Sequence, residues 1–552
     1  MKAAKKNILT LAVLLSLFVF VTSSCKKQLD VGNPNDPTIA GNVNNESGII
    51  SLAKGGVYIN GFNGYFATPW AYQELMADVV GADGANNQIS TIGQPDYIIN
   101  GTSTPNPTTT SVNIIRNYNT RAASGTGSNV LYFQWSAMYA LNNACNTVLS
   151  VVDGIHFSGD ASTKTNTIKA WCYWWKGYAY QSIGLMYYSG LILDQANAES
   201  NMYVSHDKII EQSNKYLSMA ATILSGITNG QVYANILGQL IPGFCQVGNG
   251  GVLTPAMWLR NINTMLARNI LLNKLSPFVN NDLNAVIHNS SALTMTAPDW
   301  NSVLMYTNNG IRKGDYIFTG RAPASNYFFD PDFGSVSSMS LNDNITSIFE
   351  ITERFIQNFK SGDLRLAYNF YQGPVYHNNY VYSTRWSMAD HGGVIQNVYT
   401  YGTKSANNYE LIMAGSYEEN ALMLAEADIR TGHTREGLQY VDSVRNYLGA
   451  GIAPVADSAF SQTQAMQELV QERRVSLVFR GLSFYDSRRW GWSYDRNNGG
   501  GTYHNILLSS TGTLYTNVIF NYNFMDYWDV PADEILLNPP SGNSTPVRNP
   551  NY

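Results

Sequence analysis

The strongest constraint on the fold is a pair of long segments in which small residues are interleaved with large aromatic ones. These segments are residues 130–152 (VLYFQWSAMYALNNACNTVLSVV) and 164–189 (KTNTIKAWCYWWKGYAYQSIGLMYYS). In the first segment Ala137, Ala140 and Ala144 recur at roughly the 3.6-residue period of an α-helix. We therefore predict two long helices and a core that is mainly helical.

Further helices are predicted from apolar periodicity at residues 207–226, 255–275, 408–431, 435–448 and 462–480. Two other regions lack such a period. Residues 98–128 are rich in Thr, Ser, Asn, Pro and Gly, and this composition predicts a surface loop. Residues 276–400 contain clusters of Gly, Asn, Pro and aromatic residues, so we expect only short helices or strands there.

One stretch in the C-terminal part indicates how the helices are paired. The segment EENALMLAEADIRTGHTREGLQYVDSVRNYLG (418–449) is typical of a helix, a turn at Gly432 with Thr434 as N-cap, and a second helix. Ala425 and Ala427 are the small residues expected at the helix crossing. Such pairs resemble tetratricopeptide units, although no strict repeat is visible. The predicted fold class is mainly α: a tetratricopeptide-like helical-pair scaffold with large irregular loop insertions in a single large domain.

Charged residues are scarce in this chain. Asp, Glu, Lys and Arg make up 13% of it, about half of the roughly 25% typical of soluble domains. Asn, Ser, Thr and Gly supply the polarity instead, together with 36 tyrosines and 11 tryptophans. Such a surface suits uncharged polar ligands. The net charge of -5 argues against nucleic acid, because nucleic-acid binding relies on Lys and Arg to neutralise phosphates.

The N-terminus predicts the cellular compartment. MKAAKKNILTLAVLLSLFVFVTSSC has a basic start, an apolar run from Ile8 to Val21 and then small residues, which together are typical of a signal peptide over residues 1–24. Cys25 follows directly and resembles the lipidated cysteine of a bacterial lipobox. Residues 25–50 are predicted to be the lipid anchor and an extended leader. A lipid holds such a chain to a membrane without spanning it.

The remaining cysteines are Cys145, Cys172 and Cys245. They form no CxxC motif, and their connectivity cannot be read from the sequence. One disulfide is possible. Buried free thiols are the simpler interpretation.

The run QERRVSLVFRGLSFYDSRRW (471–490) raises the question of whether it forms an active site or a structural frame. On the helix predicted at 462–480, the apolar stripe continues onto Arg473 and Arg474. A buried unpaired charge is costly, so these arginines need carboxylate partners. Glu426 is the candidate partner. The dense Leu, Val and Phe content favours a frame, with Gly481 ending the helix.

The same run carries a family resemblance. ELVQERRVSLVFRGLSFYDSRRWG (468–491) resembles the signature of the SusD/RagB-like lipoproteins of Bacteroidetes. The matching residues are Glu472, Arg473, Arg474, Phe479, Gly481, Asp486, Arg489, Trp490 and Gly491. Ser476 and Arg480 stand where the family has glutamates, and Ser483 stands where it has arginine. LAEADIRTG (424–432), the leader LDVGNPNDPT and the tail VPADEILLNPPSGNSTPVRNPNY (530–552) resemble further family motifs.

This resemblance implies a lipid-anchored protein exposed on the cell surface at the outer membrane. Such proteins form a lid on a SusC-like TonB-dependent barrel and capture oligosaccharides, or in some branches peptides, for import. The implied domain spans residues 51–552, with an irregular ligand-face insertion around 276–400. In the family, the ligand face is built from N-terminal loops and this middle region.

Aromatic residues in these loops are the candidate ligand contacts, because aromatic faces pack against sugar rings. The candidates are Tyr65, Phe66 and Trp70 (GYFATPW), Tyr97 (QPDYIIN), Trp300 and Tyr306 (PDWNSVLMYTNN), and Tyr327 and Phe328 (SNYFFDPD). Trp300 leads the list, because it is expected in a polar loop between Asp299 and Asn301. Core packing is the alternative for each of them.

A glycoside hydrolase and a helical-repeat adaptor are the other function classes. The chain contains no GxSxG, HExxH, P-loop or GxGxxG motif. A glycosidase needs only two suitably spaced carboxylates, which sequence alone leaves open. No cofactor is expected. The segment DPDFG (330–334) leaves a structural calcium as an alternative to a simple turn.

Overall fold

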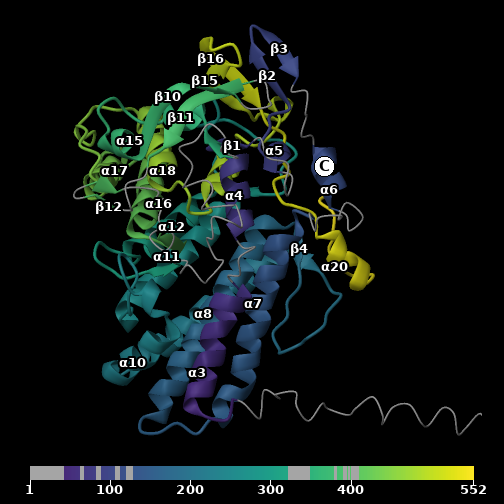
Figure 1. Cartoon of the computed structure of the whole chain (residues 1–552), viewed down its shortest axis with the longest axis vertical. Coiled ribbons are helices and arrows are strands. Elements are labelled where there is room, and N and C mark those ends of the chain that lie inside the picture. Colours follow the sequence, from purple (N-terminus) through teal and green to yellow (C-terminus); the bar gives the residue numbers. More distant parts are fainter. Residues whose placement is uncertain are drawn as a thin grey trace, which may run out of the picture.

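The computed structural model describes a largely helical chain with one main sheet (Figure 1). The described residues are 43–61, 67–82, 89–105, 112–119, 129–320, 349–377, 382–389, 394–395, 398–399 and 410–552. The predicted mainly α, tetratricopeptide-like fold class is confirmed. Within these ranges, no helix combines the length and apolar character needed to cross a membrane.

Consecutive helices pack on one another to form the scaffold. They are α7 (Tyr132–Val151), α8 (Ala161–Met186), α9 (His206–Ser225), α10 (Gly230–Leu240), α11 (Pro255–Leu272), α12 (Ala297–Asn308), α16 (Tyr417–Arg430), α17 (Thr434–Tyr447) and α18 (Gln462–Ser476). Helix α8 packs on α7 and α9, α9 on α11, α11 on α12, α12 on α16, and α16 on α17 and α18.

The helix starts follow from local sequence. The Asp160 side chain accepts from the Thr163 N–H at the start of α8, and the Ser416 side chain accepts from the Glu419 N–H at the start of α16. Ser461 and Gln464 form a reciprocal capping box at α18. Each such cap satisfies backbone donors that have no partner inside the helix.

Buried aromatic side chains fill the space between the helices. Trp171, Trp174 and Trp175 of α8 are fully buried, and Phe318 packs against all three rings. The described cysteines Cys145, Cys172 and Cys245 are buried free thiols, as the simpler interpretation of the sequence predicted.

An antiparallel sheet covers one end of the helical scaffold (Figure 1). Its strands run in the order β1 (Val80–Ala82), β9 (Phe349–Ile351), β11 (Tyr382–Met388), β15 (Thr502–Ser509), β16 (Leu514–Asn521), β2 (Tyr97–Asn100) and β3 (Thr102–Pro105), with β10 (Phe370–His377) paired to β11. Ile99 of β2 lies opposite Ile519 of β16. The sheet therefore joins the N-terminal and C-terminal parts of the chain.

Shorter helices complete the described structure. They are α3 (Glu46–Gly55) with the π-helix η1 (Gly56–Gly61), α4 (Ala67–Met76), α5 (Ile89–Ile92), α6 (Val112–Tyr118), α14 (Glu353–Ile356), α15 (Leu364–Asn369), α19 (Ser483–Arg489) and α20 (Ala532–Leu537). Helix α3 and η1 pack on α7, whereas α4, α14 and α15 contact strands of the sheet.

Several predicted boundaries are wrong. Residues 46–50 are helical rather than part of an extended leader, because Asn45 caps α3 and Ile49 and Ile50 are buried. The predicted loop at 98–128 contains β2, β3 and α6, since β2 pairs with the distant β16. The helix predicted from 408 starts only at Tyr417, after the strand β14 (Leu411–Ala414).

The end of α18 also differs from the prediction. The helix ends at Ser476 rather than near Gly481. Phe479 has a φ of 59°, in the left-handed region that ends a helix. The residues between α18 and α19 therefore form a turn that sends the chain back across the core.

Candidate ligand cavity

A cavity of about 610 Å³ lies between α18 and the sheet. Its wall is formed by the end of α4, the segment 278–281, α14 with the turn that follows it, one side of α18, residues 492–493 and the start of β15. These elements come from both ends of the chain, and the sheet brings them together. Its volume lies within the range of pockets that bind small molecules.

Amide and aromatic side chains dominate the cavity wall. The amides are Asn280, Asn281, Gln357, Asn358, Gln467, Gln471 and Asn505, and the aromatic residues are Phe278, Phe359, Trp492, Tyr503 and Tyr522. Amides both donate and accept hydrogen bonds. Aromatic rings offer flat apolar faces against which an apolar ring of a ligand can pack. The wall therefore suits a ligand with hydroxyl groups on an apolar ring.

Backbone strain is concentrated at this cavity. Asp78, Asn280, Asn281 and His504 line it and have φ values of 54°, 52°, 60° and 57°. They are four of the seven non-glycine residues with positive φ in the described part of the chain. Strained backbone of this kind is found preferentially at ligand sites.

The rim is held by a histidine between two amides. His504 Nδ1 lies 3.0 Å from Asn517 Oδ1, and His504 Nε2 lies 3.0 Å from Asn280 Oδ1. His504 and Asn280 are both exposed. The imidazole thus links β15 to the segment that contains Asn280.

A buried ion pair supports the inner wall. Arg354 Nε and Nη2 each donate to the Asp78 carboxylate at 2.8 Å. The Arg354 guanidinium also lies 4.7 Å from the centre of the Phe520 ring. Bidentate geometry of this kind fixes both side chains. The pair therefore holds α14 against the turn that follows α4.

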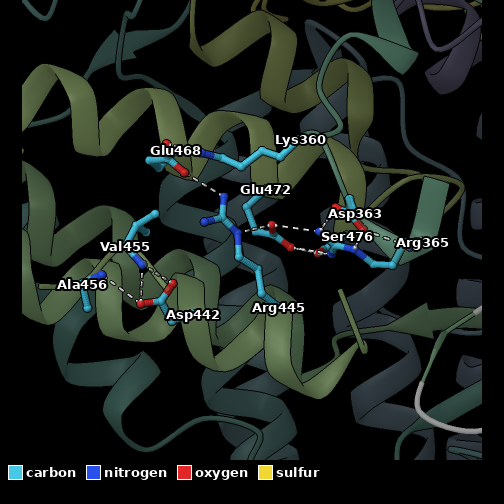
Figure 2. A network of polar contacts seen from close by, with 10 residues as sticks. All are labelled: Lys360, Asp363, Arg365, Asp442, Arg445, Val455, Ala456, Glu468, Glu472 and Ser476. Carbon is cyan, nitrogen blue, oxygen red and sulfur yellow. Dashed lines mark hydrogen bonds and ion pairs between the residues drawn. The ribbon is translucent and has the colours of Figure 1, made fainter. Parts of the chain in front are cut away.

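A larger network of charges joins α18 to α15 and α17 and is drawn in Figure 2. Glu472 accepts from Arg365 Nη1 at 2.7 Å and from Arg445 Nε at 2.9 Å, and it also accepts from the Ser476 hydroxyl. Burial alone would raise the pKa of Glu472, but the two arginines lower it to about 2. Arg445 continues to Glu468, which reaches the cavity.

The network is balanced in charge. Lys360 Nζ lies 2.5 Å from Glu468 Oε1, and Asp363 pairs with Arg365 at 2.7 Å. Three cations, Lys360, Arg365 and Arg445, therefore face three carboxylates, Asp363, Glu468 and Glu472. This arrangement joins α15, α17 and α18 as a frame.

The signature arginines belong to a second buried cluster. Arg473 donates to both carboxylate oxygens of Asp486 at 3.0 Å, and Arg489 bonds Asp486 at 2.7 Å and Glu426 at 2.6 Å. The prediction that Glu426 pairs with Arg473 is wrong. The turn after α18 places Asp486 next to Arg473, and Arg489 lies between the two carboxylates. Trp490 is fully buried against Arg489, with the guanidinium 4.6 Å from the ring centre.

The structure also places the predicted ligand contacts. Trp300 lies in α12, which begins with a capping box between Thr296 and Asp299, and not in a polar loop. Its side chain is 8% exposed and belongs to a hydrophobic cluster with Val303 and Met423. The prediction that Trp300 lies in a polar loop, on which the proposed stacking platform depended, is therefore wrong.

The other candidates do not converge on the cavity. Tyr306 packs partly buried on the Trp300 cluster, Tyr97 is partly buried in β2 near Arg496, and Trp70 is buried in α4 against Gly481. None of these three lines the cavity. Tyr65, Phe66, Tyr327 and Phe328 lie outside the described residues, as do Cys25 and the DPDFG segment.

The sequence prediction missed the cavity residues, although α18 contained a signal for them. Gln467, Gln471 and Arg474 are spaced at i, i+4 and i+7 and share one helix face, at the edge of the apolar stripe. The described ranges hold no group of three or more His, Cys, Asp or Glu side chains arranged to bind a metal ion.

Comparisons with known proteins extend this description. Residues 361–552 match the sequence model of the SusD family. No curated protein sequence matches the chain. A SusD superfamily protein from Bacteroides vulgatus has a similar solved structure, with a TM-score of 0.55 and 13% identity over 89% of this chain and 96% of that chain.

Two further solved structures are similar. A SusD-like carbohydrate binding protein from Bacteroides vulgatus has a TM-score of 0.51 and 14% identity, covering 91% of this chain and 97% of that chain. Surface glycan-binding protein A from Bacteroides fluxus has a TM-score of 0.50 and 13% identity, covering 82% and 92%. The similarity in fold thus extends over most of each chain.

Proposed function

We propose that this chain, whose residues 361–552 match the SusD family model, is a SusD/RagB-like cell-surface lipoprotein. In this proposal it binds oligosaccharides without cleaving them and delivers them to a SusC-like TonB-dependent transporter of the outer membrane. Two proteins of similar fold are described as carbohydrate binding and glycan-binding. Their identity to this chain is 14% and 13%, so they support a glycan as ligand class and not a particular sugar.

The composition of the cavity wall carries the proposal. Amides and aromatic rings surround a space of about 610 Å³. Sugar rings have apolar faces and a periphery of hydroxyls, so they match both kinds of side chain. The strained rim at Asn280, Asn281 and His504 is what a preformed binding site would show.

The charged groups of the wall support binding without cleavage. Asp78 and Glu468 are the carboxylates among the described lining residues. Asp78 is held by Arg354, and Glu468 by Lys360 and Arg445. A glycosidase needs one carboxyl group kept protonated as an acid and a second one free to act as base or nucleophile. Carboxylates held by cations suit neither role.

The N-terminus supports the proposed location. A basic start and an apolar run precede Cys25, which we propose is lipidated. A lipid at Cys25 would tether the folded chain at the outer membrane. The transporter would then receive ligand from a protein held at the same membrane surface.

A glycan panel tests the proposal. The purified mature protein is incubated with neutral and acidic oligosaccharides and with a pool of peptides, and both binding and product formation are measured. We expect binding of at least one oligosaccharide with no cleavage. Cleavage would indicate a hydrolase, and binding of peptides alone would indicate the peptide-capturing branch.

A further inference from the structure

The cavity wall carries more positive than negative charge. Its described lining residues include three cations, Arg354, Lys360 and Arg474, and two carboxylates, Asp78 and Glu468. Arg354 is paired with Asp78, and Lys360 is paired with Glu468. Arg474 remains as the one additional cation among them.

Arg474 is held in place without a carboxylate partner. Its Nη1 and Nη2 both donate to the Ala77 carbonyl oxygen at 3.2 Å, and its guanidinium lies 5.4 Å from the centre of the Trp492 ring. It makes no ion pair within the described part of the chain. A guanidinium has five N–H donors, so these contacts leave donors for a ligand.

Asp78, Glu74 and Asp486 interact electrostatically with Arg474, but none of the ion pairs in the described residues joins them to it. Asp78 is taken by Arg354, and Asp486 lies between Arg473 and Arg489. Burial raises the pKa of Glu74 to about 8, with the hydroxyl of Ser483 and nearby Arg474 opposing this shift. Glu74 is therefore mostly uncharged at neutral pH.

Trp492 and Ser493 add specific features beside this cation. The Trp492 indole Nε1 donates to the Phe278 carbonyl oxygen at 3.0 Å, which fixes the ring orientation. Ser493 is 1% exposed, and its hydroxyl has no hydrogen-bond partner.

We infer that the ligand of this cavity carries a carboxylate, as a uronic acid residue does, and that this carboxylate pairs with Arg474 while the sugar ring lies against Trp492. This inference rests on the proposed function, because it names the class of glycan. A charge-assisted hydrogen bond from a guanidinium to a carboxylate is stronger than one to a hydroxyl. The amide of Gln471, which lines the cavity on the same helix, would then serve the sugar hydroxyls.

Calorimetry with matched ligands tests the inference. The probes are oligogalacturonides, oligoglucuronides and alginate oligosaccharides, each as the free acid and as the methyl ester, which removes the charge and keeps the ring. We expect the wild-type protein to bind one free acid at least about tenfold more tightly than its ester. This arm uses the unmodified protein and does not depend on a variant folding.

Variants then assign the effect to one residue. Arg474→Gln should reduce the affinity for the acid to that for the ester, and Arg474→Lys should retain part of the preference. Arg435→Gln is the control, because Arg435 is exposed and paired with exposed Asp457. Arg435→Gln should change neither the affinity for the free acid nor the affinity for the ester.

Each of the other outcomes refutes either the acidic-ligand inference, the role of Arg474 or the proposed function. Equal affinities for acid and ester, or binding of neutral oligosaccharides alone, refute the acidic-ligand inference and leave the proposed function standing. A preference for acid that persists in a folded Arg474→Gln protein refutes the role of Arg474. Binding of no oligosaccharide, or of peptides alone, refutes the proposed function itself.

Discussion

Replacing Glu472 with Gln tests the idea that α18 belongs to a structural frame behind the cavity. The Glu472 carboxylate is 2% exposed and accepts from Arg365 at 2.7 Å and from Arg445 at 2.9 Å. Glu472→Gln keeps the shape and removes the charge, leaving two buried arginines short of one carboxylate. Breaking a buried pair costs about 3 to 5 kcal/mol of stability.

The lowered pKa of Glu472 corresponds to a similar contribution to the stability of the fold. Its lowering from 4.5 to about 2 corresponds to about 3 kcal/mol of stabilisation. Because the folded-state pKa lies below the unfolded value, this contribution is fully present above pH 4.5 and is lost as the pH falls toward 2. The cost of Glu472→Gln should therefore shrink across that window.

Urea unfolding followed by tryptophan fluorescence measures both effects. At pH 7 we expect Glu472→Gln to lower the free energy of unfolding by about 3 kcal/mol or more, whereas the control Glu211→Gln should leave the midpoint unchanged. Glu211 pairs with Lys208 on the exposed side of α9. An unchanged free energy for Glu472→Gln at pH 7, or a loss of the same size at every pH, would refute the role given to this network.

Three further predictions concern other parts of the chain. Trp300→Ala should lower the melting temperature through loss of about 3 to 5 kcal/mol of core packing, while calorimetry on the folded fraction shows an unchanged glycan affinity; an unchanged melting temperature would contradict core placement. Cys25→Ser should move the protein from the membrane fraction to the soluble fraction, and persistence in the membrane would argue against lipidation. Glu74 has a raised pKa of about 8, so its contribution to the stability of the wild-type protein should fall as the pH rises from about 4.5 to about 8. Glu74→Gln should lessen this fall in a series of melting curves, and parallel curves would show that Glu74 titrates normally.

The helical scaffold could be predicted because its signals are local. The apolar period and the small residues of α7 and α8 lie within single segments, and the predicted ranges agree closely with Tyr132–Val151 and Ala161–Met186. The cap at Ser461 is likewise encoded within a few residues. The family motifs around Arg473 and Asp486 are also contiguous in sequence, so the resemblance could be recognised.

The sheet and the cavity could not be predicted in this way. Strand β2 is stabilised by β16, and Asp78 by Arg354, across separations that no local pattern reveals. The polar residues beside Trp300 predict a loop, whereas Asp299 lies in the first turn of α12 and completes the capping box with Thr296. The partner of Arg473 depended on the path of the turn after α18, which brings in Asp486.

The connection between the two ends of the chain has a consequence for the order of assembly. Arg116 of α6 donates to the Asp529 carboxylate at 2.7 Å across 413 positions, and β2 adds to the sheet beside β16. A chain made from its N-terminus leaves β2 and β3 without their neighbour until nearly all residues exist. Such high contact order slows folding, and the waiting strand edge is open to intermolecular pairing. Fragments that stop before residue 514 should therefore aggregate, and chaperone dependence should be greatest for nascent chains approaching that length.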